Sequence, residues 1–314
     1  MILHGGPDAG PPPRYDFSTN QNALGPYPPA LAHVREAAFA RYPEPSYREL
    51  RARLGDPARI VVGAGASELI HRLVAAHPGL VLVLCPTFGE YAHAARAQGR
   101  PLFKARSTGA FLDRLGPGVL AFLALPNNPT GELPPAAFLE AAARRGGTLV
   151  LDLAYAPLSE APVPEVPGAL RLYSPNKALG LPGVRGAYLE APPAIAEALR
   201  ARAPSWVLGA AGVAMLSNWA EPAARAWVRG TLPTLFAWRR ALAEGLLRRG
   251  YVVREGKANF LMARLGPELP RRLREKGIKV RTLEDKGLPD WARLAALGPE
   301  AQEALFSALE EADG

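Results

Sequence analysis

Through the first two thirds of the chain, short apolar runs alternate with segments in which apolar residues recur at helical spacing. The runs that predict buried strands cover residues 80–84, 119–125, 148–153, 170–173 and 184–190. The segments "ASELIHRLVAAH", "EYAHAARAQG" and "PAAFLEAAARRG" alternate with them and predict amphipathic helices. Continuous apolar strands separated by helices are typical of a mostly parallel sheet that is covered on both faces. The pattern therefore predicts an α/β fold.

The last third of the chain has a different pattern. A long helical pattern extends from about residue 218 to Arg249, and a final helix is expected from Pro299. Strand-like segments lie between them, near residues 251–254, 259–263, 278–281 and 292–296. We therefore predict three parts: an N-terminal segment (1–28) that packs with the small domain, a large domain (29–232) and a small α+β domain (233–314).

Composition and charge narrow the class of protein. Hydrophobic residues make up 48% of the chain and charged residues 21%, which is ordinary for a globular protein. The net charge of +8 comes from arginines scattered along helical segments without a nucleic-acid motif, so no nucleic-acid partner is expected. The longest apolar runs are too short to span a bilayer, and Cys85 is the single cysteine. With no secretory signal visible, these features predict a cytoplasmic protein without a membrane partner.

The residues that stand out chemically follow the predicted strands. One strand leads into "PNNPTG", the next into "DLAY" and the next into "SPNK". In an open parallel sheet the ligand site lies at the carboxyl ends of the strands. The sequence therefore predicts one site that contains Asn128, Asp152, Tyr155 and Lys177.

An anion site is expected beside these residues. The stretch "VVGAGASELI" predicts a strand, a glycine turn and a helix start, whose free N–H groups and Ser67 can bind an anion. Ser174 and Arg185 flank the lysine and offer two more phosphate ligands. Glu68 stands where a dinucleotide fingerprint has its third glycine, so that fingerprint is absent. A plain strand-to-helix turn explains the glycines equally well.

Taken together, these residue types fit pyridoxal phosphate. Its aldehyde requires a lysine for a Schiff base, its ring nitrogen an acidic partner, its ring oxygen hydrogen-bond donors and its phosphate an anion site. Taken singly, the residues have simpler explanations. Lys177 could extend from a loop to water, Phe88 and Tyr155 could be core aromatics, and Asn128 could shape a turn.

From about His4 to its end, the chain resembles the fold-type I pyridoxal-phosphate enzymes of the class I/II aminotransferase family. The most specific motifs are "PNNPTG" and "SPNKALGLPGVRGAYL", supported by "DLAY" and "PTFGEY". The resemblance implies a pyridoxal-phosphate-dependent enzyme. It also implies a mostly parallel seven-stranded sheet flanked by helices, beside a small α+β domain.

The resemblance assigns cofactor roles to individual residues. Lys177 forms the Schiff base and moves protons, and Asp152 pairs with the ring nitrogen. Asn128 and Tyr155 bond the ring oxygen. The other implied cofactor ligands are Phe88, which stacks on the ring, and Ala66, Ser67, Ser174 and Arg185, which hold the phosphate. Tyr42 resembles a tyrosine that reaches the phosphate from a neighbouring subunit, so a homodimer is expected.

The resemblance also implies a substrate site. Arg293 of "DWARLAALG" matches the arginine that clamps the substrate carboxylate. Two branches are close, threonine-phosphate decarboxylase and histidinol-phosphate aminotransferase, and both act on phosphorylated amino compounds. "HGG" followed by "DFSTNQNALGPYP" favours the decarboxylase, an enzyme of cobalamin biosynthesis. His4, Asn22 and Arg281 would line its substrate pocket, with Arg281 facing the substrate phosphate. The alternative is histidinol-phosphate aminotransferase or another amino-acid aminotransferase.

Other classes of function are less well supported. "SPNK" fits the S-x-x-K of serine acyl enzymes, but the accompanying S-D-N and K-T-G tripeptides are absent. A non-catalytic binding module is conceivable on the same fold, although the retained lysine argues against it. His33, His71, His77 and His93 show no metal-ligand spacing, so no metal is expected.

Overall fold

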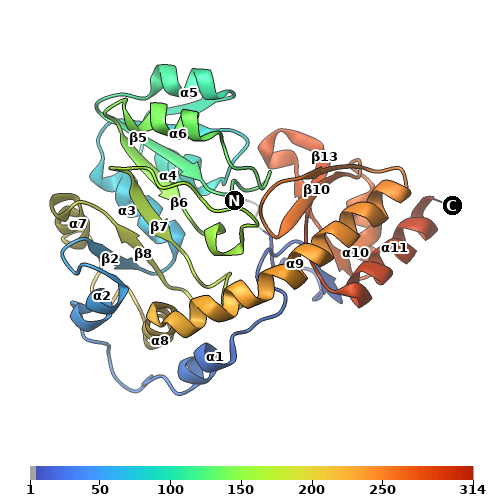
Figure 1. Cartoon of the computed structure of the whole chain (residues 1–314), viewed down its shortest axis with the longest axis horizontal. Helices are drawn as coiled ribbons and strands as arrows, with labels where there is room; N and C mark the ends of the chain where they lie inside the picture. Colours follow the sequence, from blue (N-terminus) through green and yellow to red (C-terminus); the bar gives the residue numbers. More distant parts are fainter. Residues whose placement is uncertain (1–4, 314) are drawn as a thin grey trace.

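The computed structural model describes residues 5–313, and a seven-stranded sheet dominates its larger part (Figure 1). The strand order is β2-β8-β7-β6-β5-β3-β4. The strands are β2 (Ile60–Gly63), β3 (Leu80–Leu84), β4 (Leu102–Ala105), β5 (Val119–Ala124), β6 (Thr148–Asp152), β7 (Leu170–Tyr173) and β8 (Ala187–Glu190). From β4 to β7 neighbouring strands are parallel, whereas β8 pairs antiparallel with both β7 and β2. The predicted mostly parallel, seven-stranded sheet is confirmed.

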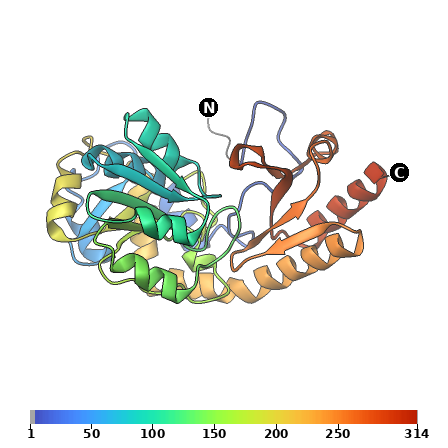
Figure 2. The same cartoon turned by 90° about the horizontal axis from the view of Figure 1, so that it is seen from above.

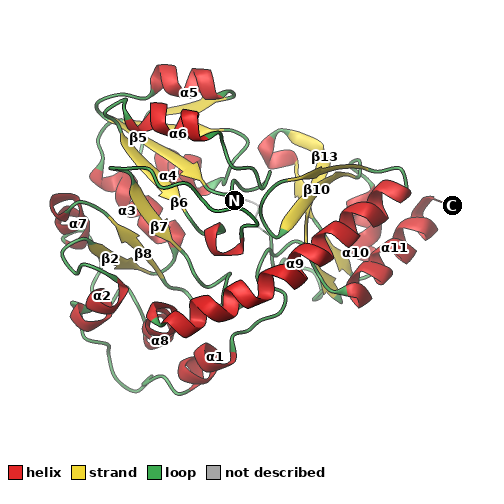
Figure 3. Cartoon of the chain, viewed as in Figure 1, coloured by secondary structure: helices red, strands yellow, loops and turns green. Residues whose placement is uncertain are grey.

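Helices cover both faces of this sheet (Figure 3). One face carries α3 (Ala66–Ala76), α4 (Glu90–Ala97) and α7 (Pro193–Arg200), and the other carries α5 (Thr108–Arg114) and α6 (Ala136–Ala143). Strand β5 shows why its sequence is apolar throughout. Leu120 and Phe122 pack on the first face and Ala121 and Leu123 on the second, because successive side chains of a strand point to opposite sides.

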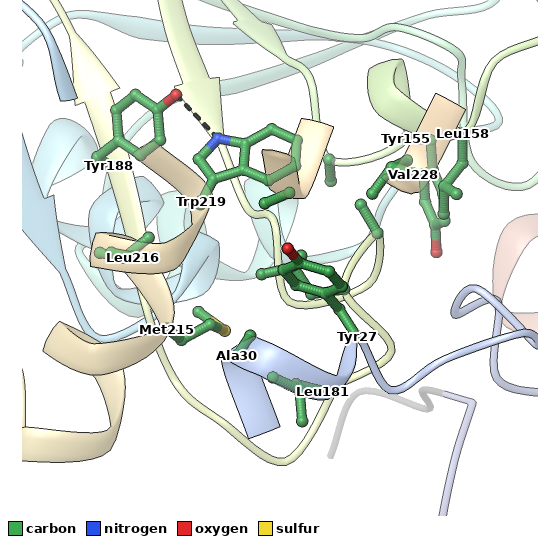
Figure 4. Packing of buried hydrophobic residues seen from close by; sticks show 14 of the residues in the cluster. Tyr27, Ala30, Tyr155, Leu158, Leu181, Tyr188, Met215, Leu216, Trp219 and Val228 are labelled. Atoms are coloured by element: carbon green, nitrogen blue, oxygen red, sulfur yellow. Dashed lines mark hydrogen bonds between the residues drawn. The ribbon is translucent and has the colours of Figure 1, made fainter. Parts of the chain in front are cut away.

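A further apolar cluster joins the β2–β8 side of the sheet to four more helices. These are α1 (Pro28–Arg35), α2 (Arg48–Leu54), α8 (Ala210–Ala220) and α9 (Pro222–Arg248). Figure 4 shows Trp219 of α8 donating from Nε1 to the Tyr188 hydroxyl at 3.3 Å. Tyr155 and Leu181 belong to the same cluster, so the loops that follow β6 and β7 are anchored in it.

The long helical pattern predicted from about residue 218 proves to be two helices. Helix α8 ends at Ala220, and α9 begins at Pro222, because proline suits the first turn of a helix, where its missing N–H costs nothing. Helix α9 then passes along both parts of the molecule (Figure 2). The expected boundary between residues 232 and 233 falls inside this helix, and the division into domains stays a prediction.

The smaller part is built on a four-stranded antiparallel sheet in the order β12-β13-β10-β9. Its elements are β9 (Val252–Glu255), β10 (Phe260–Arg264), α10 (Leu269–Glu275), β12 (Arg281–Leu283), β13 (Leu288–Ala295) and α11 (Pro299–Asp313). Short 3₁₀ helices cover Ala156–Leu158 and Glu284–Lys286. No helix in residues 5–313 is long and apolar enough to cross a membrane.

The strand predicted near residues 278–281 proves to be two strands in different sheets. Residues 278–281 form two short strands, because β11 (Ile278–Lys279) leaves the four-stranded sheet and pairs in parallel with β1 (Tyr15–Asp16). Only the strand that begins at Arg281 joins β13. The local pattern could not show this, because the partner of β11 lies more than two hundred residues earlier in the chain. The pairing ties the N-terminal segment to the smaller part.

Candidate active site

A cavity of about 270 Å³ lies at the carboxyl ends of β5, β6 and β7 and reaches to the smaller part. The predicted site residues that line it are Ala66, Ser67, Phe88, Asn128, Asp152, Tyr155, Ser174, Lys177, Arg185, Arg281 and Arg293. The strand ends therefore converge as the sequence suggested. The chemical role of each residue stays a prediction.

One corner of the cavity has the properties of an anion site. Helix α3 begins at Ala66, directly after Gly65, and its first N–H groups have no partner within the helix. Gly65 has a φ of 102°, and a Cβ built on it would lie 2.3 Å from Nη2 of Arg185. Glycine suits this turn because L side chains rarely adopt such a φ, and its missing Cβ leaves room for the guanidinium. The β2–β8 pairing makes this approach possible, because it joins Gly63 to Ala187.

The carboxylate at the end of β6 is buried and fixed. Asp152 is 4% exposed, and its Oδ2 accepts a hydrogen bond from the Tyr91 hydroxyl at 2.7 Å. Its Oδ1 accepts from the Ala154 N–H at 3.0 Å. Burial raises the pKa of the Asp152 carboxyl, whereas the Tyr91 hydroxyl acts in the opposite direction. A carboxyl group in this setting suits a cationic partner in the cavity.

Lys177 lies on a loop that hydrogen bonds hold to the N-terminal segment. Lys177 Nζ is 5.4 Å from the centre of the Tyr155 ring. The carbonyl oxygen of Lys177 accepts from the backbone N–H of Asn22 at 2.8 Å. The Asn22 side chain donates to the Ala178 carbonyl at 3.1 Å and to the Thr231 hydroxyl at 2.9 Å. Asn22 does not line the cavity, where the sequence had placed it. Its hydrogen bonds instead hold the loop that carries Lys177 in position.

A buried arginine at the cavity wall connects three segments of the chain. Arg293 of β13 is 6% exposed, and it donates to Asn128 Oδ1 at 2.5 Å and to the Ser18 carbonyl at 2.6 Å. Burial lowers its pKa. Among the described residues, Arg293 Nε and both amide atoms of Asn20 are buried without a hydrogen-bond partner. Buried polar groups almost always have partners, so these atoms at the cavity wall fit a polar ligand.

A second positive group lies on the smaller part. Arg281 and Lys286 both line the cavity, and Asp285 lies between their charges. The Arg281 guanidinium contacts both oxygens of Asp285, at 2.9 and 3.0 Å, and Lys286 Nζ is 3.0 Å from the same carboxylate. The three side chains carry one net positive charge at the cavity wall.

Tyr42, like Asn22, is not among the residues that line this cavity. Tyr42 is 75% exposed and stacks on Trp206, with 4.4 Å between ring centres. His4 lies outside the described residues. Sequence reasoning missed Tyr91, Asn20 and Lys286. Asn20 had a signal, because it stands two residues before Asn22 in the same motif. Tyr91 is the last residue of "PTFGEY", but the motif did not show that its hydroxyl contacts Asp152.

The donor set fits pyridoxal phosphate: a lysine, a buried carboxyl group, an anion corner and the aromatic ring of Phe88 line one cavity. The fit rests on the glycine turn, against which the Arg185 guanidinium lies, and on the two hydrogen bonds that fix Asp152. Ser174, expected at the phosphate, lines the same cavity, and its hydroxyl donates to Asn176 Oδ1 at 3.0 Å.

Comparison with known proteins agrees with this geometry. Residues 15–309 match the family described as aminotransferase class I and II. A histidinol-phosphate aminotransferase of Anaeromyxobacter sp. (strain Fw109-5) is 35% identical, over 93% of this chain and 89% of that protein.

Two solved structures share the fold at lower identity. The histidinol-phosphate aminotransferase of Sinorhizobium meliloti, in complex with pyridoxal-5'-phosphate, has a TM-score of 0.81 and 24% identity, over 93% of this chain and 88% of that one. The L-threonine-O-3-phosphate decarboxylase of Porphyromonas gingivalis also has a TM-score of 0.81, with 23% identity over 93% and 98% of the two chains. The chain therefore belongs to the class I and II aminotransferases, and it is a pyridoxal-phosphate-dependent enzyme.

Proposed function

We propose that the protein is a histidinol-phosphate aminotransferase, which exchanges the amino group of histidinol phosphate with a 2-oxo acid. The observation that carries this proposal is the 35% identical relative of that name, which matches along almost the whole chain. The decarboxylase favoured by the N-terminal motif has weaker support, because the solved decarboxylase shares only the fold at 23% identity. We therefore prefer histidinol-phosphate aminotransferase, which the sequence analysis gave as the alternative, over the decarboxylase.

The charges around the cavity support a phosphorylated substrate. Histidinol phosphate carries a phosphate, and a 2-oxo acid carries at least one carboxylate. Arg293 offers one cationic group, and Arg281 with Lys286 offers another on the same cavity. Hydrogen bonds between ionised partners are roughly twice as strong as neutral ones, so each cationic group can orient one anionic end of a substrate.

The remaining residues divide the chemical work. When bound, pyridoxal phosphate supplies a ring that withdraws the electron pair of the bond broken at the substrate Cα. Lys177 would hold the cofactor and carry the proton to and from Cα. Asp152 would keep the proton on the ring nitrogen, since Tyr91 and the Ala154 N–H fix its two oxygens. The anion corner at Arg185 would bind the cofactor phosphate.

The proposal is tested by a comparison of products. The purified enzyme is given histidinol phosphate with 2-oxoglutarate, and separately threonine phosphate, aspartate and alanine. Glutamate formed from the first pair, with the highest kcat/KM, is the expected result. Release of CO₂ from threonine phosphate would instead establish the decarboxylase, and a preference for aspartate would leave a general aminotransferase.

The variant Arg281→Ala sharpens this test. The loss of a hydrogen bond to a charged group costs roughly 1.5–3 kcal/mol, which is about 10- to 150-fold in kcat/KM for the phosphorylated substrate. Alanine should lose far less, because it has no second anionic end. Arg264→Ala is the matched control, since Arg264 forms an exposed ion pair with Asp290 on the same sheet. Equal losses on all substrates would contradict the assignment of Arg281.

We further propose a homodimer in which Tyr42 completes the site of the neighbouring copy. The exposed side chains of Phe39, Tyr42 and Trp206 support an interface here, at 68%, 75% and 44% exposure. Mixing Tyr42→Phe chains with Lys177→Ala chains tests it. If the sites are shared, each mixed dimer contains one intact site, which restores about a quarter of the wild-type activity in an equal mixture. No restoration would place Tyr42 outside the site.

A further inference from the structure

Two imidazoles and a carboxylate meet where α3 packs beside α4, and none of the three residues lines the active-site cavity. His71 belongs to α3, and Glu90 and His93 belong to α4. One donor atom from each of the three side chains lies within 4.8 Å of the other two. His71 Nε2 is 3.0 Å from Glu90 Oε1, and the centres of the His71 and His93 rings are 5.4 Å apart. Within residues 5–313 no other three such side chains gather this closely.

We propose that these residues bind one divalent transition-metal ion, with Zn²⁺ as the best-suited occupant. Imidazole nitrogens favour zinc, copper, nickel and iron, whereas magnesium and calcium prefer oxygen ligands. Two histidines and one carboxylate are also a recurrent set of three protein ligands around zinc, with water in the fourth position. The proposal does not depend on the substrate of the enzyme.

The backbone explains why the three ligands face one another. Glu90 and His93 are three residues apart on α4, so their side chains lie on one face of the helix. His71 faces them from α3, which packs beside α4 in the same apolar cluster. Sequence spacing alone gave no metal signal, because one ligand comes from a different helix.

The distances suit a small ion. Ligand atoms bound tetrahedrally to zinc at about 2.0–2.1 Å stand about 3.3 Å from one another. The His71–Glu90 distance of 3.0 Å already fits this geometry. His93 is exposed, so its ring can turn to complete the set and leaves the fourth position open to water. The Glu90 side chain is only 10% exposed, and its carboxylate would offset part of the charge of the ion.

The site would join two helices that bear on the cofactor region. Helix α3 supplies the N–H groups of the anion corner, and α4 begins two residues after Phe88. An ion shared by α3 and α4 therefore stabilises the folded state, since it binds residues that are far apart in the unfolded chain.

The test measures zinc binding by the chelator-treated holoenzyme, by native mass spectrometry and by titration of the melting temperature. Wild-type protein should bind one Zn²⁺ per chain and melt at a higher temperature, whereas Mg²⁺ should have no effect. His93→Ala should weaken zinc binding at least about tenfold and lose the thermal shift. His33→Ala is the matched control, an exposed histidine on another helix that should behave as wild type.

Two outcomes would overturn the proposal. Zinc could fail to bind the wild-type protein, in which case the group is a hydrogen-bonded His71–Glu90 pair beside a surface histidine. Alternatively, His93→Ala and Glu90→Gln could bind zinc as tightly as wild type, which would place the ion elsewhere. His93→Ala should melt at the wild-type temperature without zinc, so a folding defect cannot imitate loss of the site.

Discussion

Replacing Tyr91 with phenylalanine removes one hydroxyl and preserves the packing around it. Tyr91 is fully buried, and its ring stacks on Phe122 at 4.8 Å and meets Phe88 edge-on at 5.6 Å. The hydroxyl donates to Asp152 Oδ2 at 2.7 Å. A hydrogen bond to a charged group contributes roughly 1.5–3 kcal/mol, so its loss corresponds to about 10- to 150-fold in a rate constant.

The loss should appear in catalysis rather than in folding. Without the donated hydrogen bond, the pKa of Asp152, which burial already raises, rises further. The charged carboxylate then forms only at higher pH, so the acidic limb of the kcat profile should move to higher pH and kcat should fall about 10- to 150-fold.

Tyr188→Phe is the matched control for this experiment. It removes a buried hydroxyl that accepts a hydrogen bond from Trp219, outside the residues that line the cavity. This variant should lose stability and keep its pH profile. If Tyr91→Phe retained both kcat and the pH profile of the parent enzyme, Tyr91 would not support Asp152 in catalysis.

Three further predictions concern the same cavity. Lys177→Ala should abolish turnover but leave the melting temperature of the apoprotein near that of wild type; residual turnover of an amino substrate would move the catalytic amine elsewhere. Asn20→Ala should lower kcat/KM by about 10-fold with little change in stability, because the amide atoms of Asn20 have no partner among the described residues; a large loss of stability instead would indicate a structural role. Burial raises the pKa of Asp152 in the folded apoprotein, so protonation of this carboxyl group favours the folded state. The stabilisation by the proton is complete below the ordinary carboxyl pKa of about 3.9. It is lost as pH rises through the raised pKa of the folded state. Apoprotein with Asp152→Asn should therefore gain stability relative to wild type as pH rises through this window, and parallel melting curves for the two proteins would contradict the assignment.

The part of the site that lies on the sheet could be predicted from sequence. Asn128, Asp152 and Lys177 each follow an apolar run, and parallel strands bring their carboxyl ends to one edge whatever the details of packing. The fold followed from the same runs, since a strand such as β5 that is buried on both faces must be apolar throughout.

Contacts between distant segments could not be predicted in this way. The bond from Arg293 to Asn128 joins the two parts of the molecule and has no local pattern. The division of the predicted strand 278–281 into β11 and β12 was also missed, because β11 pairs with the N-terminal strand β1. The role of Tyr91 could not be predicted although it belongs to "PTFGEY", since only the structure shows its hydroxyl bonded to Asp152.

The antiparallel pairing of β2 with β8 also sets an order of events during synthesis. Gly65 and the start of α3 emerge from the ribosome early, but Arg185 and β8, which close the anion corner, emerge more than a hundred residues later. Pairing between such distant segments is slow and must wait for the later one. If Arg185 binds the coenzyme phosphate as proposed, this phosphate site is complete only after translation has passed β8. On this proposal, a truncated chain that ends before β8 has the glycine turn and the start of α3 but not the arginine of the phosphate site.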